Sequence, residues 1–489
     1  MSISLYTPAT GFPDLEIKIA YGLARVGIEA GCEFHIVPQQ GFYQIELDNF
    51  SSDKIKQSFL MTLTRLLSSD RFFDLGVKAK DKGKYSVNED TIKRLQTLFQ
   101  NYNIENFYQL NKFSDFNFKK DIFCGHKNVN KFGGSSGLIL ISSFHAGKPY
   151  FRDKIYDKFN MNLCEICGYL AVLGFNSFGF NIQMGSGKNK KYVLVLPVPE
   201  KEITKGDLIK LLSLQKTLHN FWLSDLQPLS TSTISLLAKV PSISDIVNEL
   251  RLSFHLTLVS KDNRGDTVVE QTALVNAINF SKFISYSPYN SAAVEKLLGT
   301  YNDNPKISSL IELVGVIKNL NKDSLLKFAR LYVQETSTDN WVNLLYPQTA
   351  KYLLKEVAMI KQEIIENPAL QSLARTLRYF IRERKYGYAD DIRNARKDSR
   401  DFEATIAEML REGELRRVQQ EQERQAGQEQ ERQAGKQIKI FLPTEEEMKE
   451  IFRLANEDFE ATKIALVILA FSFPSKPEEE QTGENQNEA

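Results

Sequence analysis

The sequence predicts an α+β fold, with a mixed N-terminal domain, a mainly helical middle region and a C-terminal helical bundle. Two stretches near the start, Cys32–Val37 and Gly41–Leu47, alternate apolar and polar residues as half-buried strands do. From Pro305 onward, apolar residues instead recur at helical spacing. The apolar fraction of 42% and the charged fraction of 25% are those of an ordinary soluble globular protein.

The first domain, residues 1–200, begins with a turn-rich segment and an amphipathic helix. One face of this helix carries the apolar residues Leu15, Ile19, Leu23 and Val26. Asp14 is placed to cap it. Further helices are expected at residues 55–67 and 91–102, and strands at residues 138–141 and 192–196.

After Pro197 the pattern becomes mainly helical. The expected helices cover residues 207–223, 307–319, 322–335 and 350–366, with one strand at residues 250–259. Asn367-Pro368 ends one helix and starts the next, because proline is favoured at the first helical position. The middle region is therefore assigned to residues 201–345 and the C-terminal bundle to residues 346–475.

A polar repeat interrupts the C-terminal bundle. The octad QEQERQAG at residues 420–427 recurs at 428–435, and alanine is its largest apolar residue. Such a segment cannot bury a core, so residues near 411–437 are expected to form an exposed helix or a disordered insertion. Beyond it, Thr444 and Glu447 match a capping box, and the acidic tail at residues 476–489 is predicted to be disordered.

Cysteine usage and hydropathy indicate a cytoplasmic protein. The chain has four cysteines, two of them in one CxxC pair, which argues against a disulfide framework. The apolar run Ile464–Phe471 is too short to span a bilayer, and no signal peptide is recognisable at the start. We therefore expect no association with a membrane.

Charge and aromatic residues are concentrated between Lys112 and Tyr192. This stretch contains 12 Lys/Arg and 5 Asp/Glu, a surplus of +7 in a chain whose formal net charge is +1. Ten phenylalanine and tyrosine residues lie among its lysines and arginine between residues 113 and 159. Cations beside flat aromatic rings suit a polyanion whose bases stack, so nucleic acid is the expected partner.

Two glycine-rich loops lie in the same stretch, and neither matches a nucleotide-binding fingerprint. Each precedes a strand-like run, where backbone amides can approach a phosphate. The second loop is either a phosphate-contacting tip or a solvated hairpin tip. The candidate nucleic-acid-binding residues of the stretch are Lys127, Asn128, Lys131, Ser135, Lys188, Asn189, Lys190 and Lys191.

Cys124-Gly-His126 and Cys164-Glu-Ile-Cys167 supply four candidate metal ligands. A CxxC pair is a usual half of a tetrahedral zinc site, whereas CxH is a rarer partner. The alternative is that Cys164 and Cys167 are core thiols that lead into an apolar run, with His126 an ordinary loop residue. Zinc is therefore the one candidate cofactor.

A second set of cations lies in the helix that starts at Pro368. Arg375, Arg378, Arg382 and Lys385 are spaced to form one stripe, with Leu373, Leu377 and Phe380 roughly opposite. Such a helix packs its apolar face inward and offers four cations to solvent. These cations either contact phosphate groups or form a solvated face with acidic neighbours.

Catalytic motifs are missing from the sequence. Neither HExxH nor GxSxG is present, and the adjacent carboxylates Asp390 and Asp391 have no second acidic cluster to complete a metal-nuclease site. The sequence therefore indicates a binding protein and not an enzyme.

The layout resembles the large subunit of type I CRISPR surveillance complexes (Cascade), in the version with CxxC zinc knuckles and a fused C-terminal bundle similar to the small subunit. The supporting residues are Thr10-Gly-Phe-Pro-Asp14 before a helix, the Cys164/Cys167 knuckle in a basic N-terminal domain, and the helical region at about 350–475. Here Cys124-Gly-His126 stands in place of the family's second CxxC pair.

The resemblance implies a non-catalytic role in antiviral defence or transposition. Partners would be the guide RNA, double-stranded target DNA, the other Cascade subunits, and a helicase-nuclease or a transposition adaptor. The basic loops would inspect the protospacer-adjacent motif, and the stripe at Arg375–Lys385 would stabilise the R-loop, since base pairing by the guide reads the remaining sequence. The alternatives are a nucleic-acid-processing enzyme with dispersed carboxylates, or a scaffold protein.

Overall fold

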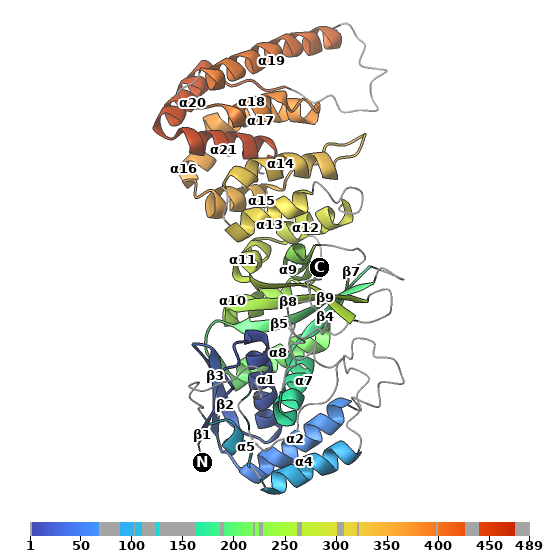
Figure 1. The fold of residues 1–489 in the computed structure, drawn as a ribbon. Helices are drawn as coiled ribbons and strands as arrows, with labels where there is room; N and C mark the ends of the chain where they lie inside the picture. The colour runs from blue at the N-terminus through green and yellow to red at the C-terminus, as the bar shows by residue number, and fades with distance from the viewer. Residues whose placement is uncertain are drawn as a thin grey trace, which may run out of the picture. The chain divides into compact units, whose positions relative to one another are not determined.

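The computed structural model describes residues 2–67, 89–101, 103–109, 124, 126, 163–185, 190–218, 221–223, 228–261, 267–300, 308–319, 322–397, 400–425 and 440–474. The chain divides into two compact units. The first unit comprises residues 1–233 and 242–278, and the second comprises residues 234–241 and 279–489. The first combines sheets with helices and the second is helical, so the predicted α+β class is confirmed (Figure 1).

A small antiparallel sheet opens the first unit. It has the strand order β1-β3-β2-β6. The strands are β1 (Ile3–Tyr6), β2 (Glu33–Gln39), β3 (Phe42–Asp48) and β6 (Ile203–Thr204). Alternate residues of the β2–β3 hairpin are buried, among them Phe34, Ile36, Ile45 and Leu47. The strand predictions at residues 32–37 and 41–47 are confirmed.

A larger sheet follows, with the order β7-β4-β5-β8-β9. Its strands are β4 (Phe180–Met184), β5 (Lys191–Pro199), β7 (Phe221–Leu223), β8 (Leu252–Lys261) and β9 (Thr267–Asn276). β4 and β7 are parallel, and the other pairs are antiparallel. The strand predictions at 192–196 and 250–259 are confirmed. The sheet contains β4 and β5, which precede residue 200, and β7, β8 and β9, which follow it. The domain boundaries at residues 200 and 345 stay a prediction.

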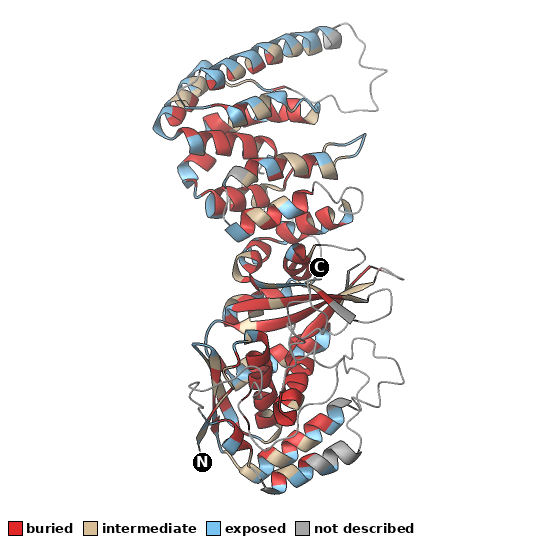
Figure 2. Ribbon diagram, viewed as in Figure 1, coloured by how far each residue is buried: buried red, intermediate tan, exposed pale blue. Residues whose placement is uncertain are grey.

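Two helices, α1 (Pro13–Glu29) and α7 (Glu165–Phe178), form the centre of the first unit. Both are almost entirely buried (Figure 2). Their backbones meet closely, because a Cβ atom on Gly174 would lie 1.9 Å from the Lys18 carbonyl oxygen and one on Gly22 would lie 2.2 Å from that of Leu170. Only glycine permits this approach at both positions.

The start of α1 differs from the prediction. Phe12 and not Asp14 is the N-cap residue, since Pro13 already occupies the first helical turn. Asp14 lies inside that turn, where its carboxylate is 3.4 Å from the Lys18 ammonium group. The buried Glu16 carboxylate instead accepts hydrogen bonds from the amides of Thr10 (2.6 Å) and Gly11 (2.9 Å), which fixes the turn before the helix.

The other helices of the first unit cover the two sheets and the central pair. They are α2 (Ser52–Leu67), α4 (Glu89–Asn101), α5 (Ile104–Phe107), α8 (Lys205–Leu218), η3 (Leu229–Thr231) and α10 (Ser242–Leu250). The helices predicted at 55–67 and 91–102 are confirmed. The helix predicted at 207–223 ends at Leu218, because Phe221–Leu223 pairs with β4 as strand β7.

The second unit is built from helices. They are α9 (Ser232–Lys239), α11 (Ile278–Tyr286), α12 (Pro288–Thr300), α13 (Ser309–Asn319), α14 (Lys322–Thr336), α15 (Pro347–Tyr352), the π-helix η5 (Leu353–Val357), α16 (Gln362–Ile365), α17 (Pro368–Arg382), α18 (Gly387–Asn394), α19 (Asp401–Gln425), α20 (Glu445–Glu457) and α21 (Phe459–Ala470). α17 packs against α20 and α21, and α19 is exposed over much of its length (Figure 2). None of the helices in the described part of the chain has both the length and the apolar character that a membrane crossing requires.

The single helix predicted at residues 350–366 is wrong. The chain passes from α15 into the wider turn of η5 and then breaks at Met359, which is 71% exposed and has a φ of 56°. A left-handed residue cannot continue a right-handed helix. The helical path therefore resumes only at α16.

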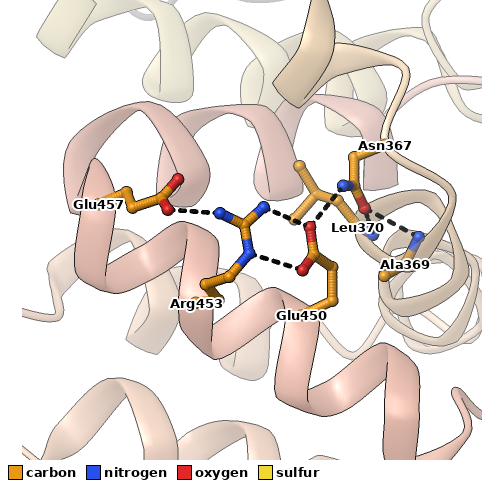
Figure 3. A network of polar contacts seen from close by, with 6 residues as sticks. All are labelled: Asn367, Ala369, Leu370, Glu450, Arg453 and Glu457. Carbon is orange, nitrogen blue, oxygen red and sulfur yellow. Dashed lines mark hydrogen bonds and ion pairs between the residues drawn. The ribbon is translucent and has the colours of Figure 1, made fainter.

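A network of polar contacts connects α20 to the start of α17 (Figure 3). Asn367 caps α17 by accepting from the amides of Ala369 (3.0 Å) and Leu370 (3.2 Å), and its side-chain amide donates to Glu450 (3.2 Å). Glu450 also accepts from Arg453 at 2.7 Å, and Arg453 contacts Glu457 in turn. The capping box predicted at Thr444 and Glu447 is confirmed.

Candidate metal centre

Four side chains from two distant parts of the sequence meet in the first unit. The ligand atoms of Cys124, His126, Cys164 and Cys167 all lie within 4.8 Å of one another, and all four residues are buried. Three sulfurs and an imidazole nitrogen are a donor set that zinc takes in tetrahedral structural sites. We call these four residues the metal centre.

The start of α7 positions the two cysteines of the CxxC pair. Cys164 is the N-cap residue of α7, and its Sγ accepts from the backbone amide of Cys167 at 3.3 Å. Residues at positions i and i+3 share one helical face, so both sulfurs face the same side. The CxxC spacing thus places two sulfurs at the metal centre by local geometry alone.

His126 completes the set with a defined orientation. Its Nδ1 lies 3.2 Å from Cys164 Sγ and 3.5 Å from Cys167 Sγ, and its Nε2 contacts the Phe107 carbonyl oxygen. A carbonyl oxygen only accepts, so Nε2 carries the proton and Nδ1 presents its lone pair to the sulfurs. His126 therefore belongs to the cluster and is not an ordinary loop residue.

The three thiols of the metal centre differ in the direction in which their pKa values are shifted. Burial raises the pKa of Cys164 and of Cys167 well above the usual value of a thiol. Burial opposes ionisation of Cys124 as well, but hydrogen bonds with Cys164 and Cys167, together with the effect of His126, lower the pKa of Cys124 well below its usual value. Cys124 is therefore the thiol of the cluster whose ionisation its neighbours favour.

The geometry fits a tetrahedral ion. Zinc bonds of about 2.0–2.3 Å to nitrogen and sulfur require ligand atoms about 3.5–3.8 Å apart. The ligand atoms here lie within 4.8 Å of one another, so a small contraction closes the set. The four side chains could therefore hold a metal such as zinc.

Most of the predicted nucleic-acid-binding residues of the N-terminal stretch lie outside the described residues. These are Lys127, Asn128, Lys131, Ser135, Lys188 and Asn189. Lys190 is described, and its ammonium group lies 4.9 Å from the ring centre of Tyr192. Lys191 forms a 2.6 Å ion pair with Glu270, which balances its charge within the large sheet.

The stripe predicted in α17 is corrected by the structure. Arg375 is exposed and Arg382 half-buried, but Arg378 is only 8% exposed, because it faces α21 and donates to the Leu469 carbonyl oxygen at 2.5 Å. Lys385 lies beyond the end of α17 and pairs with Glu412 at 2.9 Å. The prediction that one helix offers four cations to solvent is therefore wrong.

Two residues near the metal centre had no signal in the sequence. Phe107 supplies the carbonyl oxygen that orients His126, and the Tyr108 hydroxyl lies 3.3 Å from Cys167 Sγ. Their rings contact the imidazole edge to face, with centroids 5.3 and 5.5 Å away. Only the tertiary structure brings them to the cysteines.

Searches with this sequence match no protein-family model and no curated protein.

Proposed function

We propose that this chain binds one Zn²⁺ through Cys124, His126, Cys164 and Cys167, and that the ion has a structural role. The observation that supports this proposal is that three cysteines and one histidine, which are the usual ligands of tetrahedral zinc sites, are buried together in one cluster. Four protein ligands leave no open position for water or substrate, which is the arrangement of structural zinc sites. Zinc would fix the start of α7 against His126 and, through its hydrogen bond, against the Phe107 carbonyl oxygen.

Elemental analysis of the purified chain tests the metal directly. We expect about one zinc per chain, retained through gel filtration at neutral pH. A matched variant, Cys164→Ser, should lose the zinc, whereas Cys32→Ser should keep it, since Cys32 is buried elsewhere in the first unit. A wild-type protein without zinc, or a Cys164→Ser protein with full zinc content, would contradict the proposal.

We further propose that the zinc-bound chain is the non-catalytic large subunit of a Cascade complex. In that role it recognises the protospacer-adjacent motif, stabilises the R-loop and recruits a helicase-nuclease or a transposition adaptor. The support is the resemblance in sequence, together with a CxxC knuckle that here belongs to a four-ligand cluster and a helical C-terminal region. Purification of the tagged protein from its host should recover short RNAs with a shared repeat-derived flank. Recovery without RNA would contradict this assignment.

An uncompensated positive charge in the second unit supports contact with nucleic acid. We call Arg375, Arg378 and Arg382 the arginine group. Within the part of the chain that the structure describes, none of the three pairs with a carboxylate, and the charges that act on Arg378 are those of Arg382 and Arg375. The exposed Arg375 and the half-buried Arg382 are the two members that could reach the phosphates of a nucleic-acid strand, whereas Arg378 is buried against α21.

Salt-dependent binding of a labelled single-stranded DNA by the full chain tests this role. Replacing Arg375 and Arg382 with alanine removes two exposed or half-buried cations. At about 0.7 per phosphate contact, the slope of log K against log salt should fall by about 1.4. Arg453→Ala is the matched control, since Arg453 is held by Glu450 and Glu457. Equal effects from the control and the double variant would remove the arginine group from the binding surface.

A further inference from the structure

We infer that Tyr108 is a positioning residue of the metal centre, whose hydroxyl group donates a hydrogen bond to the Cys167 thiolate when a metal is bound. This inference rests on the proposed binding of zinc. Tyr108 follows α5 directly in the chain, is fully buried, and places its hydroxyl oxygen 3.3 Å from Cys167 Sγ. Within the described residues, Cys167 is the only hydrogen-bond partner of that hydroxyl.

The direction of this hydrogen bond follows from the chemistry of a metal-bound thiolate. In the metal-free cluster either atom can donate, because a thiol and a phenol each carry a proton. A cysteine that binds a metal has lost its proton, so its sulfur can only accept. The phenol must then donate, and the tyrosine holds Cys167 in the orientation that faces the other ligands.

The hydrogen bond from the Tyr108 hydroxyl would offset part of the negative charge of the metal-bound cluster. A divalent cation with three thiolates and a neutral imidazole carries a net charge of −1, and the four ligands are buried. Burial has the largest effect on the three cysteines, followed by their hydrogen bonds to one another. Hydrogen-bond donors offset such a charge, and the described residues provide the Tyr108 hydroxyl, beside Cys167, and the Cys167 amide, which donates to Cys164.

Tyr108 and its neighbour also connect the metal centre to the first strand. The Phe107 carbonyl oxygen accepts from His126, and the Tyr108 carbonyl oxygen accepts from the Tyr6 amide at 2.7 Å. The same dipeptide thus contacts two ligands of the metal centre with different groups and holds the end of β1 with a third. A loss of order at the metal centre would be passed to the small sheet through this dipeptide.

The variant that tests the inference is Tyr108→Phe in the full chain, because it removes only the hydroxyl oxygen and keeps the buried ring. Outer hydrogen bonds of this kind contribute about 10–100-fold to metal affinity. We expect Tyr108→Phe to bind Zn²⁺ about 10–100-fold more weakly in competition with a chromophoric chelator. We also expect the Co²⁺-loaded protein to show a shifted thiolate-to-metal charge-transfer band, a change that a purely structural tyrosine would not cause.

Tyr21→Phe provides a matched control. Tyr21 is another fully buried tyrosine of the first unit, and its hydroxyl donates to the Pro197 carbonyl oxygen at 2.8 Å, away from the metal ligands. This variant should lose thermal stability but keep the zinc affinity and the Co²⁺ spectrum of the wild type. Equal zinc affinities in Tyr108→Phe and the wild type would overturn the inference, and so would equal losses in both variants. A wild-type chain that binds neither metal would overturn the proposed zinc site itself.

Discussion

The two units of this protein bury polar groups in different ways. In the first unit, the four residues of the metal centre face one another, and Tyr108 and the Phe107 carbonyl oxygen satisfy the atoms that remain. In the second unit, Arg378 is buried with one hydrogen bond to Leu469, and its Nε has no partner in the described residues. The comparison shows that burial alone does not indicate stability: the metal centre can be completed by an ion, whereas Arg378 carries an uncompensated charge.

The same contrast appears in acidity. Burial, followed by the neighbouring Arg382 and Arg375, lowers the pKa of Arg378 to about 9. The group therefore stays charged at neutral pH, at a cost to the stability of the folded state. At the metal centre, by contrast, burial opposes ionisation of Cys124, but its neighbours in the cluster lower its pKa well below the usual value. The metal centre thus collects groups that a cation would stabilise, whereas Arg378 is a buried cation with no carboxylate partner in the described residues.

The largest expected difference concerns the metal. Cys167→Ser, or removal of zinc with a chelator, should cost the first unit several kcal/mol, because the energy of binding a structural ion is also folding energy. Unfolding of the second unit should not change. Differential scanning calorimetry with zinc analysis measures both.

The control for this prediction is Cys32→Ser, which alters a buried cysteine outside the metal centre. Cys32→Ser should retain zinc and lose little stability. A loss in Cys32→Ser as large as that in Cys167→Ser would contradict a special role for the cluster.

Glycine to alanine substitutions should have opposite signs in the two units. Gly174→Ala places a methyl group 1.9 Å from the Lys18 carbonyl oxygen, so α1 and α7 must separate, at a cost of about 3 kcal/mol or more. Gly315→Ala, within α13, meets nothing within 4 Å and should stabilise the second unit by up to about 1 kcal/mol. Urea unfolding of both variants is the measurement. A tolerated Gly174→Ala would show that the helices do not meet closely.

Arg378→Met should leave the second unit as stable as before, or make it more stable. Methionine fills a similar volume without the unpaired buried charge, although the bond to the Leu469 carbonyl oxygen is lost. Thermal unfolding in low-phosphate buffer measures the effect. Arg453→Met removes an exposed and fully paired arginine and should cause a small loss of stability. A clear loss in Arg378→Met would show that the arginine is mainly a support for the end of α21.

The smallest expected effect depends on pH. Hydrogen bonds from Tyr388 and Lys385 lower the pKa of Glu412 to about 2, from an ordinary value of 4.5. Because the folded-state pKa is depressed, the stabilisation is complete above pH 4.5 and is lost as the pH falls toward 2. Glu412→Gln should therefore unfold at a slightly lower temperature than the wild type at pH 7, with the difference vanishing near pH 2. A constant difference across this range would contradict the role of the charge.

Local pattern was sufficient for much of the fold. The strands of the β2–β3 hairpin, the capping box at Thr444 and Glu447, and the start of α17 at Pro368 were predicted correctly, since each depends on residues within a few positions. The points at which predicted helices are interrupted were not predicted. η5 and Met359 interrupt a continuous helical pattern, and residues 221–223 leave the helical pattern to pair with a strand. Long-range pairing and packing override helical periodicity at these points.

The sequence by itself determined the chemistry available to this protein, and the tertiary structure decided how it is arranged. The CxxC spacing places Cys164 and Cys167 on one side of a helix start, but His126, 38 residues from Cys164, reaches them only because the chain folds back. The arginines of α17 are evident in the sequence, but the packing of α21 decides that Arg378 is buried while Arg375 is exposed. Tyr108 gave no signal at all, since nothing in its neighbourhood in the chain indicates a thiolate 3.3 Å from its hydroxyl. Local sequence fixes which groups share a helical face, whereas burial and long-range contacts fix which of those groups meet.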